Sequence, residues 1–398
     1  MLGKKDIWNS RYYIIPKVYM TIAGVWPYHR LRDRCICFVP MFTFCFSILI
    51  PQLLYVLNAM DLDDIFEGLP SVLISIIFSY KIANMMFNNK HIKSCLKMME
   101  EDWLSLNTDV ERVILARHSE YGRYLTIFYA IFMNITSFFY LMKPVIMTLL
   151  EDNAANVKKS PISGASKLPF QVEYGKKLDQ YFYPITIHCY LGVFAHVFST
   201  IAVDTFYYTV VQHTCGMFSI VGHMLEDIGK DSDANFHMKL DKIKDIHYHK
   251  ALNCLRRHLN VIKFAKLIES TFTNIFLISI NLNMVIGSIC GIQVVMNLSN
   301  ARDIAAPLAI YIAQLIHLFL QFWQAQFLLD YSTIPYESIG NWYYTSKRCR
   351  KIFLLIMNRT MSPCKLTAGK IMTLSIESFA AVLKTSMSYF TVLRSFQS

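Results

Sequence analysis

Polar and aromatic side chains recur inside long apolar stretches of this 398-residue sequence, and as a set they suit the binding of a small hydrophobic molecule. Such a pocket is mostly apolar and carries a few hydrogen-bonding groups that orient its ligand. The residues that fit this description are Tyr80, Asn134, Ser137, Phe138, His188, Tyr190, Phe194, Phe198, Tyr311 and Gln314. For any single member, packing between helices is the alternative, so the prediction concerns the set.

A second pattern lies near the C-terminus, where Ser388, Val392 and Ser395 recur about one helical turn apart. A short helix with a polar wall and an apolar collar suits a pore, in which a hydrophobic constriction closes by dewetting. Small polar residues also hold membrane helices together. The spacing therefore leaves both a pore and a packing role open.

Enzyme signatures are missing from the sequence. It contains no GxSxG, HExxH or GxxxxGK[ST] motif, which are the patterns of a serine nucleophile, a zinc protease and a phosphate-binding loop. His247, His249 and His258 are close enough in sequence to suggest a metal site, but solvated histidines on a helix are the simpler interpretation. We expect no enzymatic activity, no metal and no cofactor.

The elements that must position these residues are membrane-spanning helices. Apolar residues make up 54% of the chain, its mean hydropathy is +0.33, and uncharged runs reach the roughly 20 residues that cross a bilayer. Seven spans are predicted, of which the second and last are weaker because they contain Lys81 and Lys384. The spans are Cys35–Leu57, Leu69–Phe87, Tyr124–Leu150, Pro184–Val203, Ser270–Met296, Ile304–Leu329 and Ser378–Leu393. The fold class is an all-α integral membrane protein, because only helices satisfy their own backbone in lipid.

The orientation follows from the basic residues. Segments 1–34, 88–123, 213–266 and 330–370 hold 29 of the 39 Lys and Arg residues, whereas the alternate loops hold 7. Basic residues collect in cytoplasmic loops, and the same bias accounts for the net charge of +11 without nucleic acid. We predict an inverted topology, with the N-terminus in the cytoplasm and the C-terminus outside the cell.

Four regions follow from this topology. Residues 1–34 form a cytoplasmic N-terminus, and 35–329 form six transmembrane helices that bind the ligand. Apolar residues at helical spacing predict that helices continue into the cytoplasm at 88–123 and 213–266. Residues 330–374 complete a cytoplasmic helical anchor bundle, and 375–398 hold the seventh helix, which is the candidate pore lining, with a short extracellular tail.

The C-terminal third resembles a known family. The residues that carry the resemblance are Phe322-Trp323, Trp342-Tyr343, Ser375-Ile376-Glu377-Ser378-Phe379, Leu383-Lys384-Thr385-Ser386 and Ser388-Tyr389-Phe390. They are similar to the insect odorant receptors, and the length and inverted topology extend the match to the whole chain. The related gustatory receptors carry Thr-Tyr…Gln-Phe where this sequence has Ser388-Tyr389…Ser395-Phe396, so the odorant branch is favoured.

The resemblance implies an odorant-gated, non-selective cation channel in the plasma membrane of olfactory neuron dendrites. The channel would be a heterotetramer with the odorant co-receptor Orco, and this chain, with its compact second cytoplasmic loop, would be a tuning subunit. Small volatile hydrophobic ligands would bind in the outer half of the second, third, fourth and sixth spans. The resemblance also places the gate at Val392 and Phe396, with Ser395 lining the selectivity region.

Three alternatives remain. One is a gustatory-type ligand-gated channel. A second is a G-protein-coupled receptor, which has its N-terminus outside and usually a disulfide in its second outer loop, whereas residues 151–183 contain no cysteine. The third is a secondary transporter, which places paired charges at mid-membrane; here Lys81, Lys384 and Asp204 come near that depth.

Overall fold

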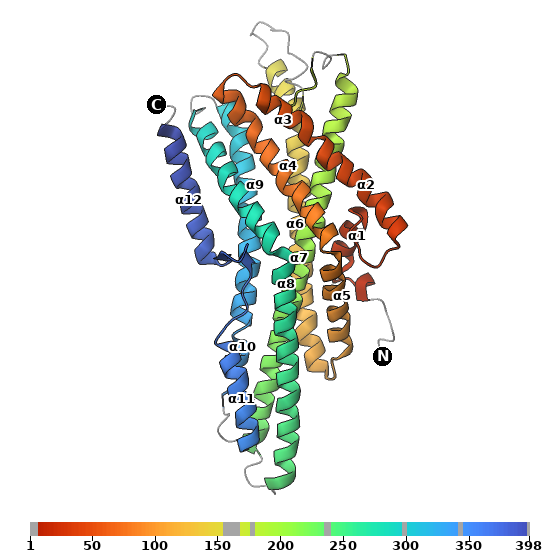
Figure 1. The fold of residues 1–398 in the computed structure, drawn as a ribbon, viewed down its shortest axis with the longest axis vertical. Coiled ribbons are helices and arrows are strands. Elements are labelled where there is room, and N and C mark those ends of the chain that lie inside the picture. Colours follow the sequence, from red (N-terminus) through yellow and green to blue (C-terminus); the bar gives the residue numbers. More distant parts are fainter. Residues whose placement is uncertain are drawn as a thin grey trace.

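The computed structural model describes residues 7–153, 168–175, 180–234, 240–296, 301–340 and 345–395, and it is a long bundle of helices (Figure 1). A short 3₁₀ helix, η1, and a two-stranded hairpin are the other regular elements of this part of the chain. In order they are η1 (Ile7–Asn9), α1 (Ile14–Ile22), α2 (Leu31–Ser47), α3 (Leu49–Asn58), α4 (Leu62–Phe87), α5 (Asn89–Leu104), α6 (Asp109–Asn153), α7 (Phe182–Ala234), α8 (Leu240–Met296), α9 (Ala301–Tyr331), α10 (Ile334–Glu337), α11 (Lys347–Thr360), β1 (Thr367–Ala368), β2 (Met372–Thr373) and α12 (Ile376–Ser395).

The prediction of an all-helical membrane protein is confirmed. Six helical stretches are long and apolar enough to cross a bilayer, and each coincides with one of the first six predicted spans: Leu31–Asn58, Leu62–Phe87, Asp109–Ile146, Phe182–Ile228, His247–Met296 and Ile304–Glu337. The seventh predicted span lies in α12, which is 20 residues long but is not among the six. The orientation remains a prediction from the basic residues; the end that it places outside the cell is called the outer end here.

The first predicted span is two helices rather than one. α2 ends at Ser47 and α3 begins at Leu49, with Ile48 between them. Pro51 explains the break, because it has no backbone N–H to donate to the carbonyl of Ser47 and its ring crowds that carbonyl. The chain therefore changes direction near the outer end, where α3 crosses above α4 (Figure 1).

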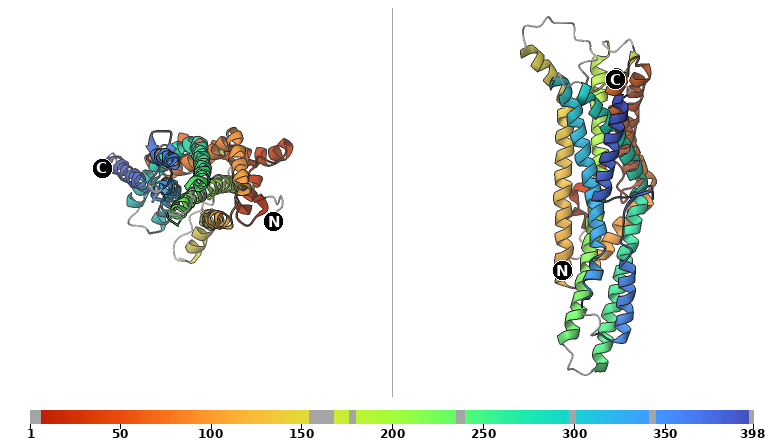
Figure 2. Two further views of the ribbon diagram at one scale, coloured as in Figure 1. Left: turned by 90° about the horizontal axis from the view of Figure 1, so that it is seen from below. Right: turned by 90° about the vertical axis from the view of Figure 1, so that its left-hand side faces the viewer.

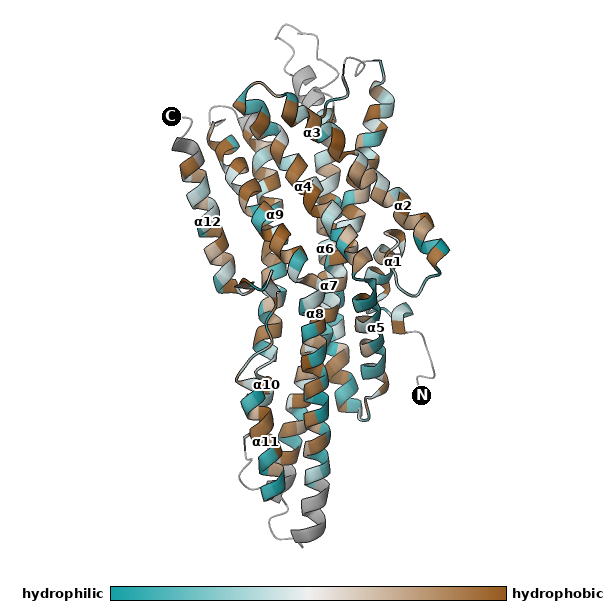
Figure 3. Cartoon of the chain, in the orientation of Figure 1, coloured by the Kyte–Doolittle hydropathy of each residue, from teal (hydrophilic) through white to brown (hydrophobic). Residues whose placement is uncertain are grey.

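α7 is the centre of the bundle. It contacts α6, α8, α9, α4, α2 and α1, and every residue from Ser199 to Phe218 is buried. Figure 2 shows α7 inside the bundle when it is viewed along its long axis, with α12 at the edge. Hydropathy changes along the bundle. In Figure 3 the upper helices are mainly apolar, and α5 and the lower part of α11 are more polar.

Two local motifs fix the start of α12. In the hairpin before it, Gly369 and Lys370 both have φ near +60° and form the centre of a β-turn, which the N–H of Ile371 closes by donating to the carbonyl of Ala368 at 3.0 Å. The backbone N–H of Ser378 then donates to the side chain of Ser375 at 3.1 Å, and the N–H of Ser375 donates back to the Ser378 hydroxyl at 2.9 Å. This reciprocal cap satisfies two backbone donors, so α12 begins at Ile376.

At the opposite side of the bundle, α1 is held by a buried tyrosine. The hydroxyl of Tyr13 accepts a hydrogen bond from Trp103 at 2.8 Å and lies 3.0 Å from the hydroxyl of Ser119. Burial raises the pKa of Tyr13 to about 12, so the phenol stays neutral at physiological pH. These contacts fix α1 against α5 and α6, and α1 in turn presents Tyr19 to the bundle.

Candidate functional site

A shallow surface cavity of about 460 Å³, widely open on one side, lies at the outer end of the bundle between α3 and the segment 171–175. Ile50, Pro51 and Leu54 supply apolar wall, and the polar groups are those of Ser47, Asn58, Glu173 and Tyr174. The backbone of this segment is tied to α3, because the N–H of Glu173 donates to the carbonyl of Pro51 at 2.9 Å. A volume of this size is typical of small-molecule sites.

His188, predicted as a ligand residue, lies behind two residues that line this cavity and does not line it itself. Its Nε2 lies 2.8 Å from the hydroxyl of Ser47, and its Nδ1 lies 2.6 Å from the hydroxyl of Tyr174. Both of these partners line the cavity. One imidazole nitrogen must donate and the other accept while the ring is neutral, so the three side chains form a polarised chain that a ligand on either hydroxyl would perturb.

An apolar cluster closes the bundle beside His188. Its buried members come from the residue before α3, the segment 168–172 and the start of α7. They are Ile48, Leu168, Phe170, Val172, Ile185 and Cys189. The ring of Tyr140 on α6 stacks on Phe170, with centroids 6.1 Å apart. The segment 168–172 thus packs on Tyr140 of α6 and on the start of α7.

Three more predicted residues gather between α6, α7 and α1. The rings of Phe194 and Phe198 lie 4.0 Å apart, and Tyr19 of α1 packs 5.2 Å from Phe198. The amide of Asn134 donates to the hydroxyl of Tyr19 at 3.2 Å. Helix α1 therefore completes this aromatic group, a contribution that hydropathy analysis of the spans did not include.

The other predicted residues on α4, α6 and α7 are less concentrated. Ser137 donates to the carbonyl of Met133 in its own helix, and Phe138 is 59% exposed. The hydroxyl of Tyr190, 36% exposed, lies 3.5 Å from the carbonyl of Leu141, and Tyr80 packs against the main core. These four residues are not drawn into one cavity with His188.

Tyr311 and Gln314 lie on a different side of the bundle. They line a small pocket where α9 meets α8 and α12, together with Asn283 and Ser386. They therefore face the predicted pore helix. The predicted ligand set divides into an outer group near α3, α7 and α1 and a separate pair beside α12.

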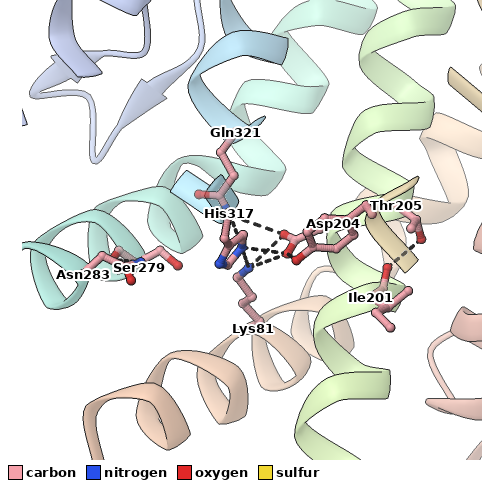
Figure 4. A network of polar contacts seen from close by, with 9 residues as sticks. Lys81, Ile201, Asp204, Thr205, Ser279, Asn283, His317 and Gln321 are labelled. Carbon is pink, nitrogen blue, oxygen red and sulfur yellow. Dashed lines mark hydrogen bonds and ion pairs between the residues drawn. The ribbon is translucent and has the colours of Figure 1, made fainter. Parts of the chain in front are cut away.

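A buried ionic network joins α4, α6, α7 and α9. The sequence analysis did not predict it as a site. Both carboxylate oxygens of Asp204 on α7 accept from the ammonium of Lys81 on α4, at 2.8 Å each. The hydroxyl of Tyr129 on α6 donates to Asp204 at 2.5 Å, and His317 on α9 lies 3.0 Å from it. Figure 4 shows Lys81, Asp204 and His317 converging, with Gln321 above them.

The network joins the four helices that the resemblance assigns to ligand binding. Lys81 and Asp204 are 0% and 2% exposed, so both charged groups are shielded from water. Two charges in so dry a place persist only when they are paired and hydrogen-bonded. The sequence did contain a signal for this site, which is that Lys81 and Asp204 lie within or next to predicted spans. A charged residue inside a span is a functional candidate by default.

The predicted pore helix has a different environment. α12 packs on α8 and α9, while Ser388 is exposed and Val392 is 51% exposed. The hydroxyl of Ser388 donates to the carbonyl of Lys384 in its own helix at 3.1 Å. Ser395 ends α12 and Phe396 lies outside the described residues, so the structure adds nothing on their side chains.

Comparisons with known proteins agree with this architecture. The sequence model of the 7tm odorant receptor family matches residues 61–387. Odorant receptor 13a of Drosophila melanogaster is 29% identical over 210 residues, which cover 49% of this chain and 48% of that receptor, or about half its length. Odorant receptor Or1 of Anopheles gambiae is 20% identical over 368 residues, covering 87% and 85%.

A solved structure shares the fold. The olfactory receptor OR5 of Machilis hrabei, in complex with eugenol, superposes with a TM-score of 0.76 over 97% of this chain and 100% of that one, at 11% identity. The same receptor in a second structure gives a TM-score of 0.74.

Proposed function

This chain belongs to the insect odorant receptor family, and from that premise we propose that it is the tuning subunit of an odorant-gated cation channel. It is a multi-pass membrane receptor rather than an enzyme. The proposal adds that the channel is non-selective, that it assembles with the co-receptor Orco as a heterotetramer, and that it works in the plasma membrane of olfactory neuron dendrites.

The observation that carries the ligand part of this proposal is the outer cavity with its Ser47–His188–Tyr174 chain. Its volume, about 460 Å³, and its apolar wall suit a volatile molecule with one hydrogen-bonding group. The ligand's apolar part would reach toward Phe194 and Phe198 in the outer half of the bundle. That the related Machilis receptor was solved with eugenol, an aromatic molecule with a hydroxyl group, supports a ligand of this chemistry.

The channel part is supported by the surface of α12. Its Ser388 and Val392 are exposed in the single chain, so other subunits are free to meet this helix around a shared axis. Binding would favour the open arrangement of these helices, because a ligand shifts an equilibrium toward the state that it binds more tightly. We place the gate at Val392 and Phe396 and the selectivity position at Ser395.

The test is a current measurement in cells that express this chain with the co-receptor. A panel of volatile alcohols, phenols and esters should evoke cation currents. His188→Ala should raise the half-maximal concentration about 2- to 12-fold for hydroxylated ligands, since a hydrogen bond contributes about 0.5–1.5 kcal/mol. His223→Ala is the matched control, because His223 lies far along the same helix and is partly exposed. Absence of current for the whole panel, with the receptor at the cell surface, would contradict the proposal.

A further inference from the structure

The small pocket between α8, α9 and α12 has the dimensions of a water site. Its volume is about 20 Å³, whereas one buried water needs at least about 10–15 Å³ and two to four polar partners. An odorant is far too large for this space. Polar groups from all three helices line it: Asn283 from α8, Tyr311 and Gln314 from α9, and Ser386 from α12.

Asn283 supplies an unsatisfied acceptor. The residue is only 6% exposed, and its amide nitrogen donates to the carbonyl of Ser279 at 2.8 Å. Its Oδ1 atom is buried and has no hydrogen-bond partner in the part of the chain that the structure describes. Figure 4 shows Asn283 on α8, separate from the ionic network. A buried acceptor left unpaired is unfavourable, so a donor in this pocket would be bound favourably.

Two glycines explain why α12 lies so close to α8 here. A Cβ atom on Gly287 would lie 3.0 Å from the hydroxyl oxygen of Ser386 and 3.3 Å from the ring of Tyr311. A Cβ atom on Gly291, one turn later, would lie 3.1 Å from the ring of Phe390. Small residues at this spacing let membrane helices approach closely. The pocket exists because Gly287 has no side chain to fill it.

The pore helix also bonds directly to α8 at this point. The hydroxyl of Ser288 donates to the backbone carbonyl of Ser386 at 2.9 Å, and the hydroxyl of Ser386 lies 3.2 Å from the carbonyl of Met284. α9 touches the same place through Tyr311 and Gln314, and one turn further it carries His317 of the ionic network. α9 is therefore the element common to the network, the pocket and α12.

We propose that this pocket binds one water molecule, which donates to Oδ1 of Asn283 and bridges it to Gln314 of α9 and Ser386 of α12. The bridge is the joint through which a movement of α9 reaches the pore helix. Tyr311 and Gln314 then act in coupling rather than in contact with the odorant. The water site stands on the geometry alone, while the coupling role rests on the proposed channel function.

Two substitutions remove the water in different ways. Asn283→Leu deletes the acceptor at similar volume, and Gly287→Ala fills the pocket. Asn281→Leu is the matched control on α8, since Asn281 is exposed and its amide donates to the carbonyl of Leu277 in its own helix. In the complex with the co-receptor, we expect Asn283→Leu and Gly287→Ala each to raise the half-maximal odorant concentration about 3- to 10-fold, the effect of losing one hydrogen bond. Asn281→Leu should change it less than 2-fold.

A density map of the assembled receptor, detailed enough to show other buried waters, tests the site without any current. A peak within hydrogen-bond distance of Asn283 Oδ1 in the wild type that vanishes in Gly287→Ala supports the site. An empty pocket in such a map overturns the proposal. If the wild type responds to odorant and Asn283→Leu responds identically, the coupling role is overturned, whereas a wild type silent to every ligand is a failure of the proposed function.

Discussion

The ionic network and the predicted pore helix both place polar side chains within apolar helices, but they differ in how the hydrogen-bonding groups are satisfied. Asp204 has four partners from α4, α6 and α9, all within the same chain. Ser388 and Val392 on α12 face outward, and Ser388 bonds only to its own helix among the described residues. The hydrogen bonds of Asp204 are all made within one chain, whereas α12 has an exposed surface that other subunits could contact.

The environment of a charge or hydroxyl therefore depends on how deeply it lies in the bundle. In the interior, water is excluded and each polar group must find a protein partner or cost stability. On the periphery, a hydroxyl remains available for ions or other helices. Polar side chains thus hold helices together around α7, whereas the hydroxyl of Ser388 on α12 lies at the surface.

The largest effect expected is from breaking the network. Asp204→Ala leaves the ammonium of Lys81 buried without its counter-ion, which should cost about 3–5 kcal/mol and abolish most folded protein at the cell surface. Surface labelling and size-exclusion profiles in detergent measure this. Asp227→Ala, at a half-exposed carboxylate of the same helix, is the control.

A double variant sharpens this result. Lys81→Met together with Asp204→Asn removes both charges and should recover much of the folded protein that either single change loses, because no unpaired charge remains. If the double variant is as unstable as the sum of the single variants, the pair is not coupled and our account of the network is wrong.

A smaller and different effect is expected on α12. Val392→Ser should leave folding unchanged and raise the current without odorant several-fold, because a hydroxyl lowers the cost of wetting an apolar constriction. Patch-clamp recording of basal current, normalised to surface protein, measures this. Leu354→Ser, at an exposed residue of α11, is the control; equal basal currents in wild type and Val392→Ser would remove Val392 from the gate.

The smallest effect concerns an exposed ion pair with the same chemistry as Lys81–Asp204. Lys97 and Glu101 lie 3.4 Å apart on α5 with side chains 70% and 61% exposed. Lys97→Ala should change the free energy of unfolding by less than about 0.5 kcal/mol, since water screens such pairs. Thermal unfolding of the purified receptor measures this, and a loss comparable to that of Asp204→Ala would contradict the comparison.

The sequence by itself determined the membrane fold, because length and apolarity of the runs are set by the bilayer and need no tertiary information. The first six predicted spans match helices in place, and the residue pattern from Phe322 to Phe390 was enough to indicate the family. One boundary was missed within the first span, where Pro51 breaks the helix near Ile48. This break could have been predicted from the sequence, because a proline interrupts a helix without any tertiary contact.

Only the tertiary structure decided which residues share a site. Helical periodicity tells which residues lie on one face, but the rotation of each helix against its neighbours is set by packing along its whole length. That rotation turns Tyr311 and Gln314 toward α12, brings His188 against Ser47 and Tyr174, and joins Lys81 to Asp204 across 123 positions of sequence. Contacts between distant residues depend on the whole packed bundle, and so the polar centre of this receptor emerged only when its helices were assembled.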